Sequence, residues 1–314
     1  MLCPAQIRVS ARCIFMPWQV IIYQLAHSIL LRSSCCLKIS RVGIAAKINS
    51  ADATRVALDA GKFLASKGIE VSYTSEVSGQ AGVRPVALDK MSVDLVVVVG
   101  GDGTIMRAAQ KVGNTPILGI KVGALGFLCE TAPDSARDAL EKVISNRFFL
   151  DYKTKLSVKC MDLDLPEALN EVLVTTTKPS KILVLSVSKD GEPLHRGRAD
   201  GVIVSTTTGS TAYALSAGGP VVDPSLDVIE VVFTCPLSAG LRPTLFPNSA
   251  KVEVSVLPGG SPGLVVLDGQ TTVPVDYNIP IVIEKSEKSA AFVRISTPDF
   301  YKRIRQKIKL GFEI

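Results

Sequence analysis

Hydrophobic and polar positions follow two different patterns along the chain, and the change falls near residue 148. Up to that point, short apolar runs alternate with segments whose apolar residues recur at helical spacing. The run Asp94–Val99 is almost entirely valine and leucine, as in a strand buried on both faces of a parallel sheet. The pattern predicts a Rossmann-like α/β domain over residues 38–148. Its expected strands are Arg41–Ala46, Ile69–Tyr73, Asp94–Val99 and Pro116–Ile120, and its expected helices are Ala53–Lys67, Thr104–Val112 and Pro133–Asn146.

Beyond residue 148 the apolar runs are short and alternating, with turn residues between them. This spacing predicts an all-β, sandwich-like domain over residues 149–297. A basic helix over Phe300–Ile308, within residues 298–314, is expected to pack back on the α/β domain. The expected strands are Leu156–Cys160, Glu171–Thr175, Ile182–Ser188, Gly201–Ser205, Val228–Thr234, Lys251–Val256, Gly263–Leu267, Ile281–Glu284 and Ala291–Ile295.

Residues 1–37 fit neither pattern and form a leader of doubtful structure. The 19 uncharged residues of Cys13–Leu31 are long enough for a membrane span, but polar side chains and Pro17 interrupt them. No signal-peptide cleavage motif follows. Three interpretations stay open: an extension outside the folded protein, such as a start codon placed too far upstream, which we favour; an additional packed helix; or a signal or anchor.

The net charge of +6 suggests a polyanionic partner until its position is considered. Residues 1–51 hold six basic side chains and no acidic one, so these six account for the whole excess. The neutral remainder gives no reason to expect nucleic acid or a membrane as a partner. Four of the seven cysteines lie in the first 36 residues, and no CxxC pair occurs. This argues against a zinc site or a disulfide framework and favours the cytoplasm.

The most informative motif is GGDGT at Gly100–Thr104, between a buried strand and a helix. Glycines at the carboxyl end of a parallel strand let the backbone approach a ligand closely. A carboxylate beside phosphate repels it, so Asp102 is expected to bind Mg²⁺ or to accept a hydrogen bond or a proton from a hydroxyl. With only two histidines in the chain, a carboxylate is the natural base. The alternative is that Asp102 only caps the next helix.

Two further segments are expected to line the same cleft. Gly119–Leu128 carries three glycines after a strand and should lie beside the GGDGT loop, although an ordinary turn explains it equally well. Ser205–Tyr213 is rich in small hydroxylated residues, which suit a sugar, a phosphate or a base; a solvated loop is the alternative. Ser210 lacks a nucleophile elbow and a histidine partner, so a serine nucleophile is not expected.

Together these motifs resemble the NAD kinase family. GGDGT (100–104), the pair Asn170-Glu171, the segment DGVIVSTTTGSTAYALSAGGP (200–220) and Asp268-Gly269-Gln270 occur in the family's order, over about residues 40–310. The GGDG loop also occurs in diacylglycerol kinases and phosphofructokinases, whereas GSTAY with its flanks is highly specific. The similarity is strongest to microbial, and especially archaeal, members. It implies an NAD kinase/diacylglycerol kinase-like fold and phosphoryl transfer from ATP or polyphosphate to the adenosine ribose 2′-hydroxyl of NAD, giving NADP.

The resemblance also implies roles for residues. Asp102 would be the general base, Mg²⁺ the metal cofactor with no ligand set assigned, and Arg107 a contact to phosphate. A cytoplasmic homodimer or homotetramer, with NAD and ATP as small-molecule partners, is implied. The remaining residues implied in substrate or cofactor binding are Gly101, Gly103, Asn170, Glu171, Lys181, Arg198, Asp200, Thr208, Thr211, Ala212, Tyr213, Ala214, Leu215, Ser216 and Gln270.

Two positions depart from the family pattern. Lys121 replaces a common asparagine and would favour a phosphate group, and Thr207 replaces a proline, which should loosen its loop. Two other functions stay open. A lipid or sugar kinase could use the same GGDG loop, but the GSTAY segment argues against it. A non-catalytic NAD(H)-binding regulator would have no need of Asp102.

Overall fold

The computed structural model describes residues 37–123, 126–178, 180–297 and 299–310 of the chain. The expected leader therefore lies outside the described residues, apart from Leu37, and so does the uncharged run Cys13–Leu31. Within the described ranges, no helix is both long and apolar enough to cross a membrane.

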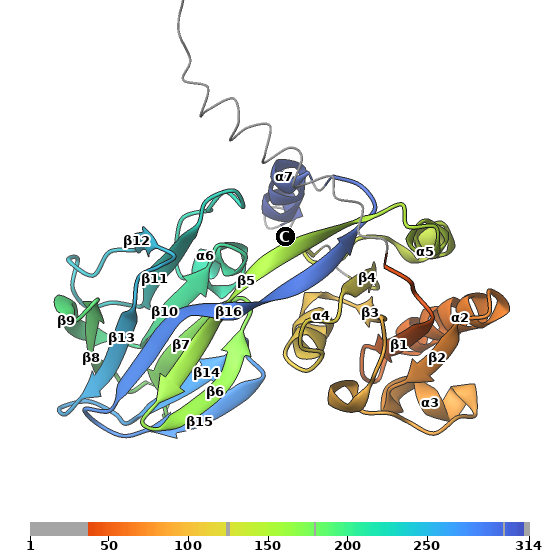
Figure 1. The fold of residues 1–314 in the computed structure, drawn as a ribbon. Coiled ribbons are helices and arrows are strands. Elements are labelled where there is room, and N and C mark those ends of the chain that lie inside the picture. The colour runs from red at the N-terminus through yellow and green to blue at the C-terminus, as the bar shows by residue number, and fades with distance from the viewer. Residues whose placement is uncertain (1–36, 124–125, 179, 298, 311–314) are drawn as a thin grey trace, which may run out of the picture.

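The N-terminal half is an α/β unit, as expected (Figure 1). Its parallel strands lie in the order β2-β1-β3-β4, and apolar side chains of α2, α3 and α5 cover one face while α4 covers the other. Two elements were not expected, α3 and a 3₁₀ turn at Leu88–Lys90. The elements are β1 (Arg41–Ala46), α2 (Ala51–Ser66), β2 (Glu70–Tyr73), α3 (Ser75–Ala81), β3 (Leu95–Gly100), α4 (Asp102–Ala109), β4 (Ile117–Lys121) and α5 (Ala136–Ile144).

The C-terminal half is mostly β, and the expected fold class is confirmed. Its six-stranded sheet has the order β12-β11-β10-β7-β14-β15 and packs against β5, β8, β13 and β16 around one apolar core. The strands are β5 (Phe149–Cys160), β6 (Leu163–Ala168), β7 (Glu171–Thr176), β8 (Leu183–Lys189), β9 (Glu192–Ala199), β10 (Gly201–Thr206), β11 (Val228–Thr234), β12 (Thr244–Pro247), β13 (Val252–Leu257), β14 (Gly263–Leu267), β15 (Thr271–Val275) and β16 (Pro280–Arg294).

The two halves share a sheet, which the sequence patterns did not predict. A ten-stranded sheet runs from β2 through β4 into β16 and on to β9, with Phe292 of β16 paired in parallel to Ile117 of β4. Two separate strands, Ile281–Glu284 and Ala291–Ile295, were expected where β16 is continuous. The prediction was wrong because a bulge and a charged stretch, between Lys285 and Ser289, interrupt the apolar pattern without ending the strand.

Helix α7 (Phe300–Leu310) lies beside the junction of the halves (Figure 1). The Phe300 ring contacts the Phe127 ring with centroids 6.0 Å apart, and Ile304 is buried. The C-terminal segment therefore reaches the loop that follows β4 in the α/β half.

Candidate active site

Asp102 stands at the carboxyl end of the buried strand β3, where α4 begins. Gly101 is the N-cap of this helix and Asp102 its first residue, two positions before the expected start at Thr104. A Cβ on Gly100 would come within 2.6 Å of the Thr104 hydroxyl, so the tight turn into the helix requires glycine. The turn places the Asp102 carboxylate at the edge where open α/β sheets bind their ligands.

The loop after β4 holds the Asp102 carboxylate. Its Oδ2 accepts the backbone N–H of Phe127 at 2.8 Å, and its Oδ1 accepts that of Leu128 at 3.1 Å. A Cβ on Gly126 would lie 2.2 Å from Oδ1, so this close approach depends on glycine. The expected contact between the two glycine-bearing segments is thus confirmed. The carboxylate binds this loop, so the interpretation of Asp102 as only a helix cap is wrong.

A cleft of about 1350 Å³ lies beside this loop, between the two halves and α7. Phe127 and Leu128 line one part of it, and Thr208 and Thr211 line another. Small-molecule sites commonly measure roughly 300–1,000 Å³. The cleft therefore has room for a dinucleotide together with a phosphoryl donor.

Asn170 and Glu171 are held in place by Asp268. The Oδ1 of Asp268 accepts the backbone N–H of Asn170 at 2.8 Å and that of Glu171 at 3.1 Å, and Oδ2 accepts that of Leu169 at 2.7 Å. Burial raises the pKa of Asp268, and the three N–H donors oppose that rise. Two motifs of the sequence, Asn170-Glu171 and Asp268–Gln270, thus form one structural unit.

Glu171 joins this unit to the segment Gly209–Ser216. The backbone N–H of Tyr213 faces its carboxyl and lowers its pKa slightly, while Oε2 has no hydrogen-bond partner among the described residues. Burial, followed by the nearby charge of Asp268, raises the pKa of Glu171 to about 7. A carboxyl group that is partly neutral near pH 7 can both donate and accept hydrogen bonds with a ligand.

The hydroxylated segment is packed rather than solvated, so the solvated-loop interpretation is wrong. A Cβ on Gly209 would lie 2.2 Å from the Asn170 carbonyl oxygen, which shows how closely this segment passes. Thr207, expected to loosen the loop, donates to the Leu226 carbonyl at 2.9 Å, a bond that proline cannot make. The buried hydroxyl-bearing residues are Ser205, Thr206, Ser210 and Thr211.

The segment Ala212–Ser216 places its side chains unequally. Ala214 is buried beneath it against Ile203 and Val232, whereas the Tyr213 side chain is 47% exposed. The Tyr213 ring is thus free of the core and available to a ligand. Leu215 is half-buried and Ser216 is exposed.

Three expected binding residues lie away from the cleft. Lys181, Arg198 and Asp200 are exposed, and none of them lines it. Asp200 precedes β10, which spans roughly 20 Å and enters the Ser/Thr segment only at its far end. Gln270 is also exposed, but its side chain donates to the Asp268 carbonyl at 3.4 Å and so stays close to the Asn170-Glu171 unit.

Arg107 lies one turn beyond Asp102 and is bound within the protein. It pairs with Glu76 of α3 at 2.8 Å and donates to the Ala46 carbonyl at 3.1 Å. The arginine therefore ties α4 to α3 and β1. A phosphate would have to bind the guanidinium N–H groups that are not used in these two contacts.

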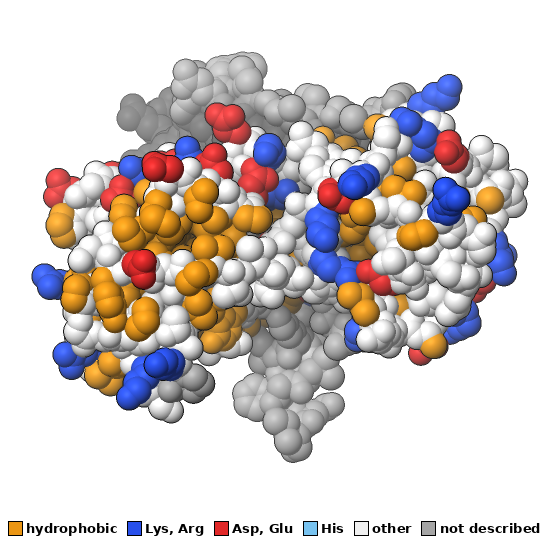
Figure 2. All heavy atoms as spheres, turned by 90° about the horizontal axis from the view of Figure 1, so that it is seen from below, with side chains coloured by type: hydrophobic (Ala, Val, Ile, Leu, Met, Phe, Trp, Pro, Cys, Tyr) orange, Lys and Arg blue, Asp and Glu red, His pale blue; other side chains and the backbone are white. Residues whose placement is uncertain are grey.

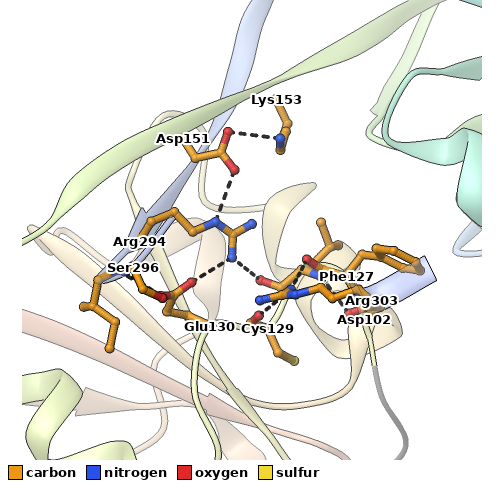
Figure 3. A network of polar contacts seen from close by, with 11 residues as sticks. Asp102, Phe127, Cys129, Glu130, Asp151, Lys153, Arg294, Ser296 and Arg303 are labelled. Carbon is orange, nitrogen blue, oxygen red and sulfur yellow. Dashed lines mark hydrogen bonds and ion pairs between the residues drawn. The ribbon is translucent and has the colours of Figure 1, made fainter. Parts of the chain in front are cut away.

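Sequence reasoning missed the polar network at the junction (Figure 3). Arg294, only 2% exposed, binds Asp151 at 3.1 Å through Nε and Glu130 at 3.3 Å through Nη1. Arg303 of α7 binds nearby, at the loop that follows β4 and holds Asp102. The signal for Arg294 was present: it is the single charge within the mainly apolar segment SAAFVRI, and a charge in a buried strand needs partners.

No group of three or more His, Cys, Asp or Glu side chains that could hold a metal ion occurs in the described part of the chain. Mg²⁺ usually keeps several waters and binds through one or two carboxylates plus substrate phosphates. Asp102 in the glycine loop supplies one such carboxylate. The residues therefore fit a magnesium ion that arrives with a nucleotide.

The loop that holds Asp102 and a segment rich in hydroxyl groups line the same cleft, and together with the matching family models they define a phosphotransferase with an alcohol acceptor. Residues 42–148 match the ATP-NAD kinase N-terminal domain, and residues 169–295 match the ATP-NAD kinase C-terminal domain. The chain belongs to the NAD kinase family, as the sequence motifs predicted.

Individual relatives agree with this assignment. The chain is 37% identical over 276 residues to an NAD kinase of Methanothermobacter thermautotrophicus, covering 86% of this chain and 97% of the relative. An NAD kinase from Archaeoglobus fulgidus, solved with ATP, has a TM-score of 0.71 at 31% identity, covering 84% of this chain and 98% of that one. Yeast NADH kinase, solved with NADH, has a TM-score of 0.79 at 25% identity, with 88% and 89% covered.

Proposed function

We propose that the protein phosphorylates the 2′-hydroxyl of the adenosine ribose of NAD to give NADP, with ATP as donor and Asp102 as general base. One observation carries the proposal: the cleft is lined both by the loop that holds Asp102 and by the Ser/Thr segment. The relatives are named NAD kinases, and one of the solved structures contains ATP.

Asp102 is suited to take the proton of the attacking hydroxyl. Each of its oxygens accepts one backbone N–H. A carboxylate offers about four acceptor positions, so about two remain for a ribose hydroxyl. Phosphoryl transfer needs mainly positioning and charge stabilisation, and a general base contributes roughly 10²–10⁴-fold. The backbone N–H groups of Gly101 and Gly103, at the start of α4, are proposed to meet the donor phosphates.

The dinucleotide is proposed to bind across the Asn170-Glu171 unit and the segment Thr211–Ser216. The Glu171 carboxyl and the Asn170 amide provide hydrogen bonds to adenine and ribose, while Tyr213 offers an exposed ring for stacking. Thr208 and Gln270 are proposed to complete the edge of this pocket. Lys181, Arg198, Asp200 and Arg107 remain proposed contacts on the family resemblance.

Mg²⁺ is proposed as the metal cofactor, and when bound it would neutralise negative charge on the donor phosphates. Polyphosphate is the alternative donor, and the cytoplasm is the proposed location.

We also propose a homodimer or homotetramer. Figure 2 shows hydrophobic side chains gathered over part of the β-rich half, while Lys and Arg are more frequent over the α/β half.

The test supplies the purified protein with Mg²⁺, a donor (ATP or polyphosphate) and an acceptor (NAD, NADH, diacylglycerol or fructose 6-phosphate). NADP formation from NAD and ATP is the expected result, and phosphorylation of only the lipid or the sugar would overturn the proposal. Asp102→Ala should still bind NAD by calorimetry yet lose about 10²–10⁴-fold in turnover. Binding of NAD without turnover by the unmodified protein would instead indicate a regulator.

A further inference from the structure

Helix α7 contacts the loop that holds Asp102 through the half-buried Arg303 as well as through the Phe300 ring. The Nη1 of Arg303 donates to the carbonyl oxygens of Phe127 at 2.7 Å and Cys129 at 3.0 Å. Burial lowers the pKa of Arg303 from its ordinary high value, but the guanidinium remains charged. Two charge-assisted bonds thus join the C-terminal helix to the backbone beside the cleft.

The two sides of this loop face different partners. The Phe127 carbonyl and the Leu128 N–H belong to one peptide group, and no peptide bond in the described residues is cis, so the two point in opposite directions. Arg303 binds the carbonyl, while Asp102 accepts the N–H at 3.1 Å. A cation at the carbonyl polarises the peptide and strengthens its N–H as a donor.

Arg294 completes the fixation of the loop. Its Nη1 donates to the Leu128 carbonyl at 3.0 Å, between the two carbonyls that Arg303 binds. Glu130 and Asp151 hold Arg294 in place, as Figure 3 shows, so this arginine belongs to the junction itself. Of these two arginines, Arg294 belongs to β16 and Arg303 to the C-terminal helix α7.

We propose that Arg303 is a positioning residue for phosphoryl transfer: it fixes the Phe127–Cys129 backbone so that two N–H groups hold the Asp102 carboxylate in its reactive orientation. The inference rests on the proposed function of Asp102. It concerns turnover rather than substrate binding, because Arg303 acts through the loop. Misplacing a reacting group by about 1 Å costs on the order of 10²-fold.

The experiment is a double-mutant cycle on the full chain, with Arg303→Met, Asp102→Ala and the combination. Arg303→Met should lower kcat about 10–100-fold with little change in KM for NAD or ATP. In the Asp102→Ala background the same change should cost almost nothing, since the loop no longer has a carboxylate to orient. Arg305→Met removes an exposed charge from the same helix and should keep full activity.

The outcomes separate the two proposals. If Asp102→Ala keeps its turnover, the proposed role of Asp102 fails. If Asp102→Ala loses turnover but Arg303→Met does not, the inference about Arg303 fails. The inference about Arg303 fails equally if Arg303→Met raises KM and lowers turnover by the same factor with and without Asp102. Arg303 would then bind substrate directly. Should Arg303→Met not fold, Arg303→Lys, which replaces the planar fork by one ammonium, is expected to show the same pattern at smaller size.

Discussion

Asp268 accepts the backbone N–H of Glu171 at 3.1 Å, although 97 residues separate the two in sequence. The same carboxylate also binds the N–H groups of Leu169 and Asn170, and Asp268 is 3% exposed. The turn after β14 thereby fixes the start of β7, where the proposed NAD pocket lies. A buried carboxylate that serves three backbone donors is hard to replace.

Asp268→Asn should destabilise the protein and weaken NAD binding. Asparagine has one acceptor oxygen and an NH₂ group, so at least one buried backbone N–H loses its acceptor, at about 1–3 kcal/mol each. Denaturant unfolding should show the lower stability, and KM for NAD should rise more than KM for ATP. Asp276→Asn, at an exposed position, is the matched control. Equal unfolding midpoints for both variants would contradict this role of Asp268.

Gly126→Ala should lower turnover with only a small effect on stability. The new Cβ would lie 2.2 Å from Asp102 Oδ1, so the carboxylate or the loop must move. A displaced general base loses rate on the order of 10–100-fold, which steady-state kinetics would measure. The control is Gly79→Ala in α3, where a Cβ meets no atom within 4 Å. If Gly126→Ala turned over NAD at the normal rate, Asp102 would not depend on its present position.

Arg107→Met tests whether this arginine serves structure or phosphate. Its contacts to Glu76 and Ala46 predict a loss of about 1–3 kcal/mol in unfolding free energy, because the partners are largely buried. If those contacts are its whole role, KM for ATP stays at its normal value. A raised KM for ATP without a loss of stability would instead assign Arg107 to the donor phosphates. Glu76→Gln should give a similar loss of stability and serves as the comparison.

The sequence predicted strands well where both faces are buried. The run Asp94–Val99 and the β strands of the sandwich interior have apolar patterns set by the core. The strands that were missed, β6, β9, β12 and β15, lie at sheet edges or off the main order, where polar residues are tolerated. β16 lies inside its sheet, but its charged stretch is mostly exposed at the bulge between Lys285 and Ser289, and this break in the apolar pattern hid the fact that both halves share one sheet.

The site was predicted in part, and the difference again has a physical cause. Local motifs pointed to Asp102 and to the Ser/Thr segment, because glycine turns and hydroxyl clusters are visible in sequence, whereas Asn170 and Glu171 were proposed only from the family resemblance. The position of the loop beside Asp102 was expected from the sequence, but the contact of Arg303 with that loop joins residues 176 apart. No local pattern encodes such contacts, since they depend on how β16 and α7 cross the junction.

Glu230 is buried, has no hydrogen-bond partner among the residues that the structure describes, and should make stability depend on pH. It lies in β11 beside Ser205 of β10, which in turn lies beside Glu171 of β7, so two buried carboxyls flank one serine across the sheet. Burial raises the pKa of Glu230 to about 7. Desolvation alone accounts for this rise. The pKa of Glu171 is raised to a similar value by burial and by the nearby charge of Asp268.

The direction of the pH effect follows from proton binding. Between the ordinary glutamate pKa and about 7, folded Glu230 keeps a proton that the unfolded chain has released, so stability falls as pH rises through this range. Glu230→Gln is neutral at every pH; it should match the unmodified protein near pH 4.5 and exceed it by on the order of 1–3 kcal/mol above pH 7. Urea unfolding between pH 4.5 and 8 measures this, with the exposed Glu192→Gln as control. Parallel pH curves for Glu230→Gln and the unmodified chain would show that Glu230 is ionised in the fold, and that burial does not control its charge.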